Sequence, residues 1–275
     1  PVGLLIHQGR VVNHPIFHRS SLLQLSSGKT LITTLGMKGA SINTPERNFV
    51  ISKTNSAHFI DSEVVAFNRA FGSHAPPHSG ATLLLEANQI LGIVDGISSP
   101  QIPLAGCAIT LPASPSLPKE TSELNLQLEK FSYKDSAIKE GMAGGPLLVI
   151  DGQVDIHRDR EDFVLSAPPV TFSQDETFDQ NLLPRMAVGQ LNNEQLLFAA
   201  IDGRNIEHAV GLTLEQSAHL MKAMGCHTAM NLDGGSSKRM VIRDRAVDLT
   251  STEVQTNSSA SEKIRPVYSA ILLHE

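Results

Sequence analysis

Residues 195–232 constrain the fold most, because they read as a strand, a helix and a second strand in succession. Gln195–Ile201 (QLLFAAI) is a short apolar run of the kind that forms a buried strand, and Thr228–Leu232 (TAMNL) is a weaker one. Between them, Thr213 and Gln216 are spaced for a capping box, and Gly225 stands where a left-handed residue ends a helix. The pattern predicts a right-handed βαβ unit with two parallel strands.

An aspartate follows each of the two predicted strands. Asp202 opens the turn Asp-Gly-Arg after the first strand, and Asp233 opens Asp-Gly-Gly after the second. If the strands are neighbours, about 4.8 Å apart, both acids leave the sheet at the same edge, which is where open α/β sheets bind ligands. Asp-Gly is also an ordinary turn dipeptide, so each acid alone has a purely structural interpretation. Their pairing at the ends of one βαβ unit favours the functional interpretation.

Cations adjoin both turns. Arg204 closes the first turn, and Lys238 with Arg239 follows the second. Guanidinium groups bind planar oxyanions through two hydrogen bonds, and consecutive amides of a loop such as Gly234–Ser237 can form an anion-binding nest. Carboxylates beside cations and such a loop indicate an anionic substrate that needs proton transfer or a metal.

Several short runs share their order and spacing with one protein family. They are Pro184–Gly189 (PRMAVG), Ile201–Arg204 (IDGR), Val210–Leu214 (VGLTL) and Asn231–Ser237 (NLDGGSS), with Gly144–Val149 (GGPLLV) and Arg265–Val267 (RPV) on either side. In these runs the chain resembles the phosphodiester glycosidase family over nearly all of residues 140–275.

The N-terminal half matches the family less well. Family members usually carry an Asn-Gly-Gly-Phe-Phe segment, whereas this chain has Ala66–Gly72 (AFNRAFG), in which only Asn68 and Phe71 match. The glycine-rich loop departs too, since Ser236 stands where the family commonly has a third glycine. These departures indicate a divergent branch of the family.

The resemblance implies hydrolysis of a sugar 1-phosphodiester to a free sugar and a phosphomonoester. Such a cleavage needs an acid or an electrophile at the leaving phosphate, and a base or a stabilising anion near the anomeric carbon. Arg185 and Arg204 are the expected phosphate clamps, and Asp202 and Asp233 are the expected acid/base groups or metal ligands. The residues expected to hold the phosphate or the sugar are Asn231, Gly234, Gly235, Ser236 and Ser237, with Asn68 as a further candidate.

Glu207 and His208 lie in the loop after Arg204, from which either side chain can reach the same cavity as a general acid or base. An exposed loop acid and histidine is no weaker an interpretation, because most loop charges are merely solvated. The sequence names no cofactor with certainty. A divalent metal, Mg²⁺ or Ca²⁺, bound by Asp202 and Asp233 stays open.

Net charge and hydropathy limit the classes of binding partner that the chain can have. The net charge of −6 argues against nonspecific binding of a nucleic-acid polymer, because counterion release needs a cationic face. No run approaches the about 20 apolar residues of a membrane helix. The expected partner is therefore a small-molecule or glycan phosphodiester, and the oligomeric state is left open. Cys107 and Cys226 stand in apolar surroundings, which predicts two buried thiols.

The first residues, Pro1–Ile6, lack the basic leader of a signal peptide. This favours a cytoplasmic location, whereas the resemblance implies possible export, because many members of the family are exported.

Short strands separated by Gly, Asn and Pro turns dominate the N-terminal half. They are predicted at Leu4–Ile6, Leu22–Leu25, Thr30–Leu35, Phe49–Ser52, Val64–Phe67, Ala81–Glu86, Ile90–Val94 and Ala108–Leu111. The proline-rich segment Ser98–Glu123 reads as an irregular surface connection, and the mixed-charge run Asp155–Asp162 reads as a solvated loop or helix face. Strands on both sides of the proline-rich segment are needed to complete one sheet system. We therefore expect a single domain over residues 1–275, of the α/β (α+β) class with a mixed, strand-rich sheet.

The sequence thus favours a hydrolase of the phosphodiester glycosidase type. One alternative is a phosphodiesterase that cuts a nucleotide, nucleotide-sugar or lipid phosphoester, with the same acids holding a metal. Another is a non-catalytic protein that binds a sugar phosphate or glycan. Two uncompensated acids beside an anion are of little use to a pure binder, so the enzyme hypotheses are preferred.

Overall fold

The computed structural model describes residues 3–13, 19–36, 41–44, 47–69, 71–86, 89–104, 106–113, 125–127, 138–161, 163, 179–251 and 270–273. The chain divides into two compact units. The N-terminal unit comprises Pro1–Ala143 with Leu165–Ser173, and the C-terminal unit comprises Gly144–Val164 with Gln174–Glu275. The single domain expected over residues 1–275 would include both units. It stays a prediction.

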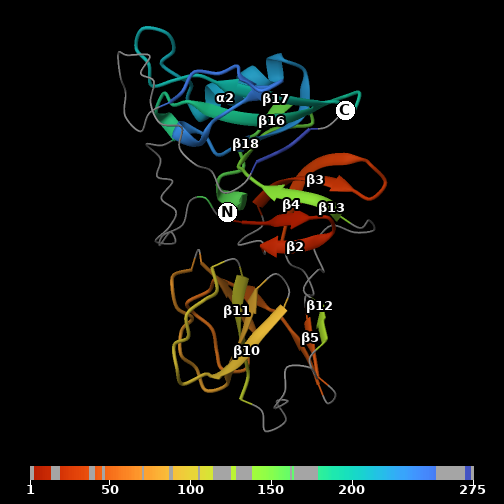
Figure 1. Ribbon diagram of the computed structural model, residues 1–275, viewed down its shortest axis with the longest axis vertical. Helices are drawn as coiled ribbons and strands as arrows, with labels where there is room; N and C mark the ends of the chain where they lie inside the picture. The colour runs from red at the N-terminus through yellow and green to blue at the C-terminus, as the bar shows by residue number, and fades with distance from the viewer. Residues whose placement is uncertain are drawn as a thin grey trace. The chain divides into compact units, whose positions relative to one another are not determined.

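The described residues of the N-terminal unit form three sheets (Figure 1). The first has the order β2 (Arg10–Asn13), β1 (Leu5–His7), β13 (Ile138–Ala143), β3 (Arg19–Leu25), β4 (Thr30–Leu35). The second has the order β10 (Gln89–Asp95), β9 (Ala81–Glu86), β11 (Gly106–Leu111), β8 (Val65–Asn68), β7 (Lys53–Thr54). The third is β12 (Asn125–Gln127), β5 (Ser41–Asn43), β6 (Asn48–Val50). The strands expected from the sequence are confirmed in this unit, with shifts of a few residues at their ends.

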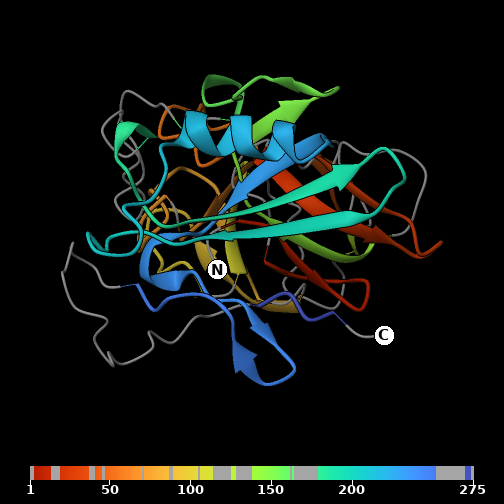
Figure 2. The ribbon, with the colours of Figure 1, turned by 90° about the horizontal axis from the view of Figure 1, so that it is seen from above.

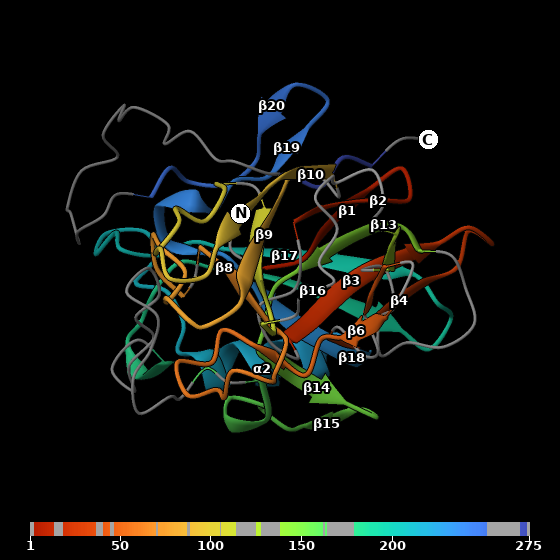
Figure 3. The same cartoon turned by 90° about the horizontal axis from the view of Figure 1, so that it is seen from below.

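The central strands of the second sheet, which is seen from below in Figure 3, are buried on both faces. Side chains alternate along its central strand β11, so that Cys107 and Ile109 enter one apolar cluster and Ala108 enters another. Ile42 and Phe49 of the third sheet pack into the first of these clusters. A strand covered on both faces has no polar side, which explains why β11 is apolar almost throughout.

The main part of the C-terminal unit is a five-stranded sheet with a helix on it, and strands β19 (Val241–Ile242) and β20 (Arg245–Ala246) form a separate two-stranded sheet. The strand order is β15 (Gln153–Val154), β14 (Leu147–Ile150), β18 (Cys226–Leu232), β16 (Arg185–Leu191), β17 (Leu196–Ile201), and every pairing is antiparallel. Helix α2 (Leu214–Ala223) lies across the sheet (Figure 2). Its buried residues Leu214, Ala218 and Met221 share one cluster with Ala187 and Ala229 of the sheet.

The expected βαβ unit exists, but its two strands are not neighbours. Strands β17 and β18 both pair antiparallel with β16, so they run parallel to each other with β16 between them. The reason is local: a tight turn, in which the amide of Leu191 donates to the carbonyl of Gln195 at 2.9 Å, first folds β16 and β17 into a hairpin. Strand β18 then takes the free side of β16. In the described residues only β7 and β8 pair in parallel, so the chain is mostly β with antiparallel sheets rather than clearly α/β.

The predicted helix signals are confirmed. The amide of Gln216 donates to Thr213 Oγ1 at 3.1 Å, and the amide of Thr213 donates to Gln216 Oε1 at 2.9 Å, which completes the capping box. Gly225 has the left-handed φ of +86° expected just past a helix end. The ends of α2 are therefore fixed by local chemistry.

Both cysteines are free and buried, as expected. Burial raises the pKa of the Cys107 thiol to about 12 and also raises the pKa of Cys226. Within the described residues no helix has the length and apolar character needed to cross a membrane. Residues 105 and 114–123 of the proline-rich segment and the run Arg265–Val267 lie outside the described residues.

The mixed-charge run Asp155–Asp162 is not entirely solvated, contrary to expectation. Glu161, in the 3-10 turn η2 (Asp159–Glu161), is fully buried. Its Oε1 accepts the amide of Leu147 at 2.7 Å, at the start of β14. A buried backbone N–H needs an acceptor, and this carboxylate supplies one.

Glycines at the edge of the C-terminal sheet allow two turns to close on the segment Leu183–Arg185. A Cβ atom on Gly203 would lie 2.6 Å from the backbone nitrogen of Pro184, and one on Gly234 would lie 2.6 Å from the Pro184 carbonyl oxygen. A Cβ on Gly211 would come within 2.5 Å of the Leu183 backbone, at a left-handed φ of +101°. These glycines are therefore required by backbone packing, whatever else the turns do.

This packing predicts that Gly203→Ala destabilises the C-terminal unit. The added methyl group meets backbone atoms that cannot rotate away, and overpacking of this kind costs about 1–3 kcal/mol. Gly92→Ala in β10 is the matched control, because nothing lies within 4 Å of its added Cβ. Urea unfolding should show a lowered midpoint for the first variant and a midpoint close to that of the parent for the second. Equal midpoints for the two variants would show that the turn tolerates a side chain.

Candidate active site

Three strand ends meet at one edge of the C-terminal sheet. Arg185 pairs with Ile201, and Met186 pairs with Leu232, so β16 begins where β17 and β18 end. Asp202 and Asp233 therefore leave the sheet on either side of the start of β16. Their strands are two spacings apart, or about 10 Å between backbones. The expectation that both acids leave the same edge agrees with this register, although the neighbouring strands assumed for it do not.

The glycine-rich loop forms the 3-10 turn η3 (Gly235–Ser237). The amide of Gly235 donates to the Pro184 carbonyl at 2.9 Å, and the amide of Ser237 donates to the Gly234 carbonyl at 3.0 Å. These two amides are engaged within the protein, so they do not contribute to the anion nest expected from the sequence. Ser236 and Ser237 are both partly exposed, which leaves their side chains at the surface of the loop.

The two candidate phosphate-binding arginines differ in burial. Arg185 is 1% exposed, and its guanidinium donates to the carbonyls of Leu212 at 3.1 Å and Asn181 at 3.2 Å. Burial lowers the pKa of Arg185 to about 10; the charge of Asp179 opposes this shift, and the charge of Arg204 adds to it. Arg204 is partly exposed and lies beside the glycine-rich loop, with Nη1 3.4 Å from the position of a Cβ on Gly235. The first turn thus reaches across the start of β16 to the second.

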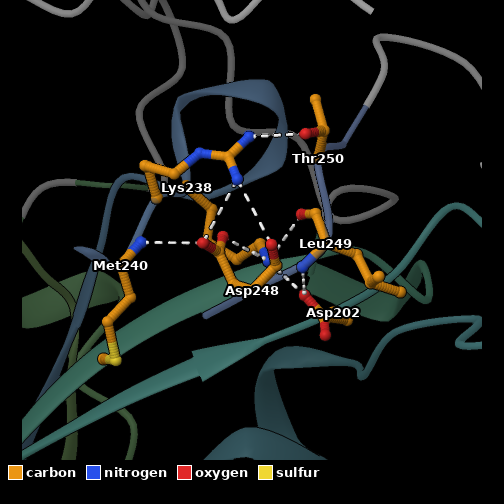
Figure 4. Close-up of polar contacts among 7 residues, drawn as sticks. Asp202, Lys238, Met240, Asp248, Leu249 and Thr250 are labelled. Carbon is orange, nitrogen blue, oxygen red and sulfur yellow. Dashed lines mark hydrogen bonds and ion pairs between the residues drawn. The ribbon is translucent and has the colours of Figure 1, made fainter. Parts of the chain in front are cut away.

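The two acids lie in different environments. Asp233 is exposed, whereas the Asp202 side chain is 29% exposed and is held by hydrogen bonds (Figure 4). Asp202 Oδ1 accepts from the ammonium of Lys238 and from the amide of Leu249 at 2.9 Å. One acid is thus fixed and the other is open to solvent.

A buried ion network stands behind Asp202. The Lys238 ammonium lies 2.8 Å from Asp248 Oδ2, and the two side chains are 0% and 2% exposed. Arg239 Nη1 lies 3.3 Å from Asp248 Oδ1, and Nη2 donates to Thr250 Oγ1 at 2.8 Å. The network closes the base of the hairpin formed by β19 (Val241–Ile242) and β20 (Arg245–Ala246).

The two candidate asparagines are both buried. Asn231 is 5% exposed, and its Nδ2 donates to the Gly145 carbonyl at 3.2 Å; its Oδ1 is buried with no hydrogen bond to the described residues. Asn68 lies on β8 of the N-terminal unit, where its Oδ1 accepts from Asn55 Nδ2 at 2.9 Å. Its role in substrate binding stays a prediction.

Glu207 and His208 form an exposed loop tip. Their backbone amides donate to Asn205 Oδ1 at 3.1 and 3.2 Å, and Asn205 and Ala209 exchange backbone hydrogen bonds. The buried side chain of Asn205 therefore shapes this loop, which the sequence alone did not indicate. Within the part of the chain that the structure describes, Glu207 and His208 have no contact that would commit them to acid or base chemistry.

Sequence reasoning identified Lys238 as a cation near the loop but not as a buried partner of Asp202, and it missed Asp248. The only available signal was the short hairpin around Arg243 and Asp244, which returns Asp248 to the loop. Among the described residues, no three His, Cys, Asp or Glu side chains gather as they would around a metal ion. The Mg²⁺ or Ca²⁺ expectation stays a prediction.

Solved structures with a similar fold include a hypothetical protein from Synechocystis, 22% identical with a TM-score of 0.52. The match covers 93% of this chain and 47% of that one. A protein from Burkholderia pseudomallei K96243 is 16% identical with a TM-score of 0.55, over 93% of this chain and 60% of that one. The chain therefore spans about half the length of these two solved structures. At these identities the likeness establishes a shared fold only.

A third solved structure is the catalytic domain of zebrafish N-acetylglucosamine-1-phosphodiester alpha-N-acetylglucosaminidase, auto-inhibited by its pro-peptide. It is 14% identical over 92% of this chain and 83% of that one, and its TM-score of 0.33 is too low to support an argument about this chain. A search of curated proteins finds no match. The family model described as phosphodiester glycosidase matches residues 115–274, which is more than half of the chain. The chain belongs to the phosphodiester glycosidase family.

Proposed function

We propose that this protein hydrolyses a sugar 1-phosphodiester and releases a free sugar and a phosphomonoester. The observation that carries the proposal is the meeting of Asp202 and Asp233 on either side of Arg185, at one sheet edge of a phosphodiester glycosidase family member. The family supports a substrate with a glycosyl–phosphate bond. The strand-end geometry supports acid and cation chemistry at that bond.

The phosphate is expected to lie beside Arg204 and the loop Gly234–Ser237. A phosphodiester carries one negative charge, and a guanidinium can bind two of its oxygens at once. Arg204 is the partly exposed arginine of the pair, whereas Arg185 already donates hydrogen bonds to two backbone carbonyls. We assign direct phosphate binding to Arg204, and we assign to Arg185 a positive charge placed behind it.

The carboxylates are expected to act on the sugar side. The transition state of glycosyl transfer carries positive charge on the ring oxygen and the anomeric carbon. Phosphate is a good leaving group, so neutralising its charge matters more than protonating it fully. Asp233 is exposed and suited to activate water as a general base. In this proposal Asp202 provides a fixed negative charge.

A panel of sugar 1-phosphodiesters and nucleotide sugars, with and without chelator, tests the reaction. We expect a reducing sugar and a phosphomonoester, with ¹⁸O from labelled water in the sugar hydroxyl. Label in the phosphate, measured by its ³¹P isotope shift, would mean that the protein is a phosphodiesterase. Tight uptake of a sugar phosphate without turnover would mean that it is a binding protein.

Asp233→Asn should lower kcat by about 10²–10⁴-fold, the range that general acid–base groups supply. The melting temperature should change little, because the side chain is exposed. Asp244→Asn is the control, since Asp244 is an exposed aspartate in the nearby hairpin turn whose left-handed φ of +61° asparagine also tolerates. A near-parental rate for Asp233→Asn would remove Asp233 from the mechanism.

Replacing each of the two arginines by alanine should have different effects on KM and on stability. Arg204→Ala should raise KM about 10–100-fold with little loss of stability, because charged hydrogen bonds contribute about 1.5–3 kcal/mol. Arg185→Ala should lower the free energy of unfolding, because it leaves a cavity in place of a side chain that is 1% exposed and removes its hydrogen bonds to the carbonyls of Leu212 and Asn181. Steady-state kinetics and urea unfolding give the two quantities. An unchanged KM for Arg204→Ala would exclude it as the phosphate clamp.

A further inference from the structure

We propose that Lys238 and Asp248 are positioning residues that hold Asp202 in place as the fixed anion of the site. From the sequence, Lys238 was expected only to be a cation near the loop, and no role was expected for Asp248. The inference rests on the proposed function for its kinetic consequence. Its structural content, a network that fixes one carboxylate, rests on the contacts alone.

The Lys238 ammonium lies between two carboxylates from different parts of the chain. Asp202 comes from the end of β17, and Asp248 comes from the segment after β20. The same ammonium donates to the Leu249 carbonyl at 3.2 Å. Lys238 itself follows η3 directly, so the glycine-rich loop, β17 and the hairpin base meet at one buried nitrogen.

The network is balanced in charge. Lys238 and Arg239 contribute two positive charges, and Asp202 and Asp248 contribute two negative charges. A fully buried ammonium is costly to remove from water unless it is paired and hydrogen-bonded. Here it has two carboxylates and a carbonyl as partners. The pairing makes the position of Asp202 a consequence of burying Lys238.

The two carboxylates of the network face different surroundings. The Asp248 side chain is 2% exposed, and its Oδ1 accepts the amide of Met240 at 2.9 Å, so its role is internal. The Asp202 side chain is 29% exposed. Its Oδ1 takes both inner donors, Lys238 and the Leu249 amide, and Oδ2 has no hydrogen bond to the described residues. In Figure 4 this second oxygen points away from the network.

This geometry suits Asp202 and Asp233 to different roles. Asp202 is anchored through Oδ1, whereas Oδ2 lies outside the network. This arrangement suits a fixed negative charge. Asp233 has no comparable anchor in the described residues and is exposed, as a group that exchanges protons with water needs to be. A fixed charge stabilises a transition state best when no side chain has to reorient as charge develops. Lys238 and Asp248 supply that fixation for Asp202.

Lys238→Met tests the proposal in the full chain. We expect kcat to fall about 100-fold, the loss typical of a reacting group displaced by about 1 Å, with KM within about threefold of the parent. Lys222→Met is the matched control, because Lys222 is an exposed lysine of α2 whose Nζ donates to Gln153. It should leave kcat and KM unchanged.

A double variant separates positioning from simple stability. Lys238→Met leaves Asp248 as an unneutralised buried acid on one side, so it also lowers the melting temperature. Adding Asp248→Asn removes that charge and keeps an acceptor for the Met240 amide, so the melting temperature should recover. If Lys238 positions Asp202, kcat stays low in the double variant. Recovery of kcat together with the melting temperature would overturn the proposal.

Hydrogen exchange gives a test that needs no substrate. The Leu249 amide donates to Asp202 Oδ1 in the parent, so its exchange should become at least tenfold faster in the double variant but not in Lys222→Met. An unchanged rate would overturn the positioning inference. Absence of turnover in the parent protein would count against the proposed function alone, since the exchange rate of Leu249 does not depend on it.

Discussion

The site depends on the insertion of β16 between β17 and β18. An antiparallel strand on each side of β16 makes the flanking strands parallel, so two strand ends and one strand start coincide at a single edge. Gly203 and Gly234 then let both turns close on Pro184 at distances that a side chain would forbid. Arg185, the residue after Pro184, is buried between two acidic turns as a result. The placement of the acids, the loop and the arginine thus follows from one strand order and from backbone contacts.

The features that depend on neighbouring residues were predictable from the sequence. The capping box of Thr213 and Gln216 and the left-handed Gly225 depend only on residues within their own turn of helix. The strands of the N-terminal unit are indicated by short apolar runs. The strand order of the C-terminal unit was not predictable in this way. The run containing Arg185 matched a family motif, but nothing local says that it pairs on both sides. Because pairing β16 with β18 joins segments far apart in sequence, the parallel direction was right and the adjacency was wrong.

Burial of charge was the other feature that local reasoning missed. Lys238 and Arg239 are adjacent cations after the same loop, yet Lys238 is 0% exposed and Arg239 is 18% exposed. Both pair with Asp248, which returns to the loop through the hairpin of β19 and β20, and Lys238 pairs with Asp202 as well. Glu161 shows the same limitation, since a mixed-charge run reads as solvated until the amide of Leu147 is found to need an acceptor. Charged residues are assigned to the surface by default, and only the tertiary partners reveal the exceptions.

The electrostatics of the edge argue for an anion there even though the chain is acidic overall. The net charge of the chain is −6, yet Arg185 and Arg204 lie close enough for the charge of Arg204 to lower the pKa of Arg185; burial lowers this pKa more strongly, and the charge of Asp179 raises it by more than Arg204 lowers it. Asp202 cannot relieve this repulsion through Oδ1, because that oxygen is occupied by Lys238 and Leu249. An anion bound beside Arg204 would offset the repulsion between the guanidinium groups. A preorganised cluster of this kind gains more from a phosphate than flexible surface lysines would, because its groups do not reorient when the anion arrives. In the proposed reaction the buried lysine and the two arginines are complementary: Lys238 fixes the negative charge of Asp202 on the sugar side, and Arg185 with Arg204 provides positive charge beside the phosphate.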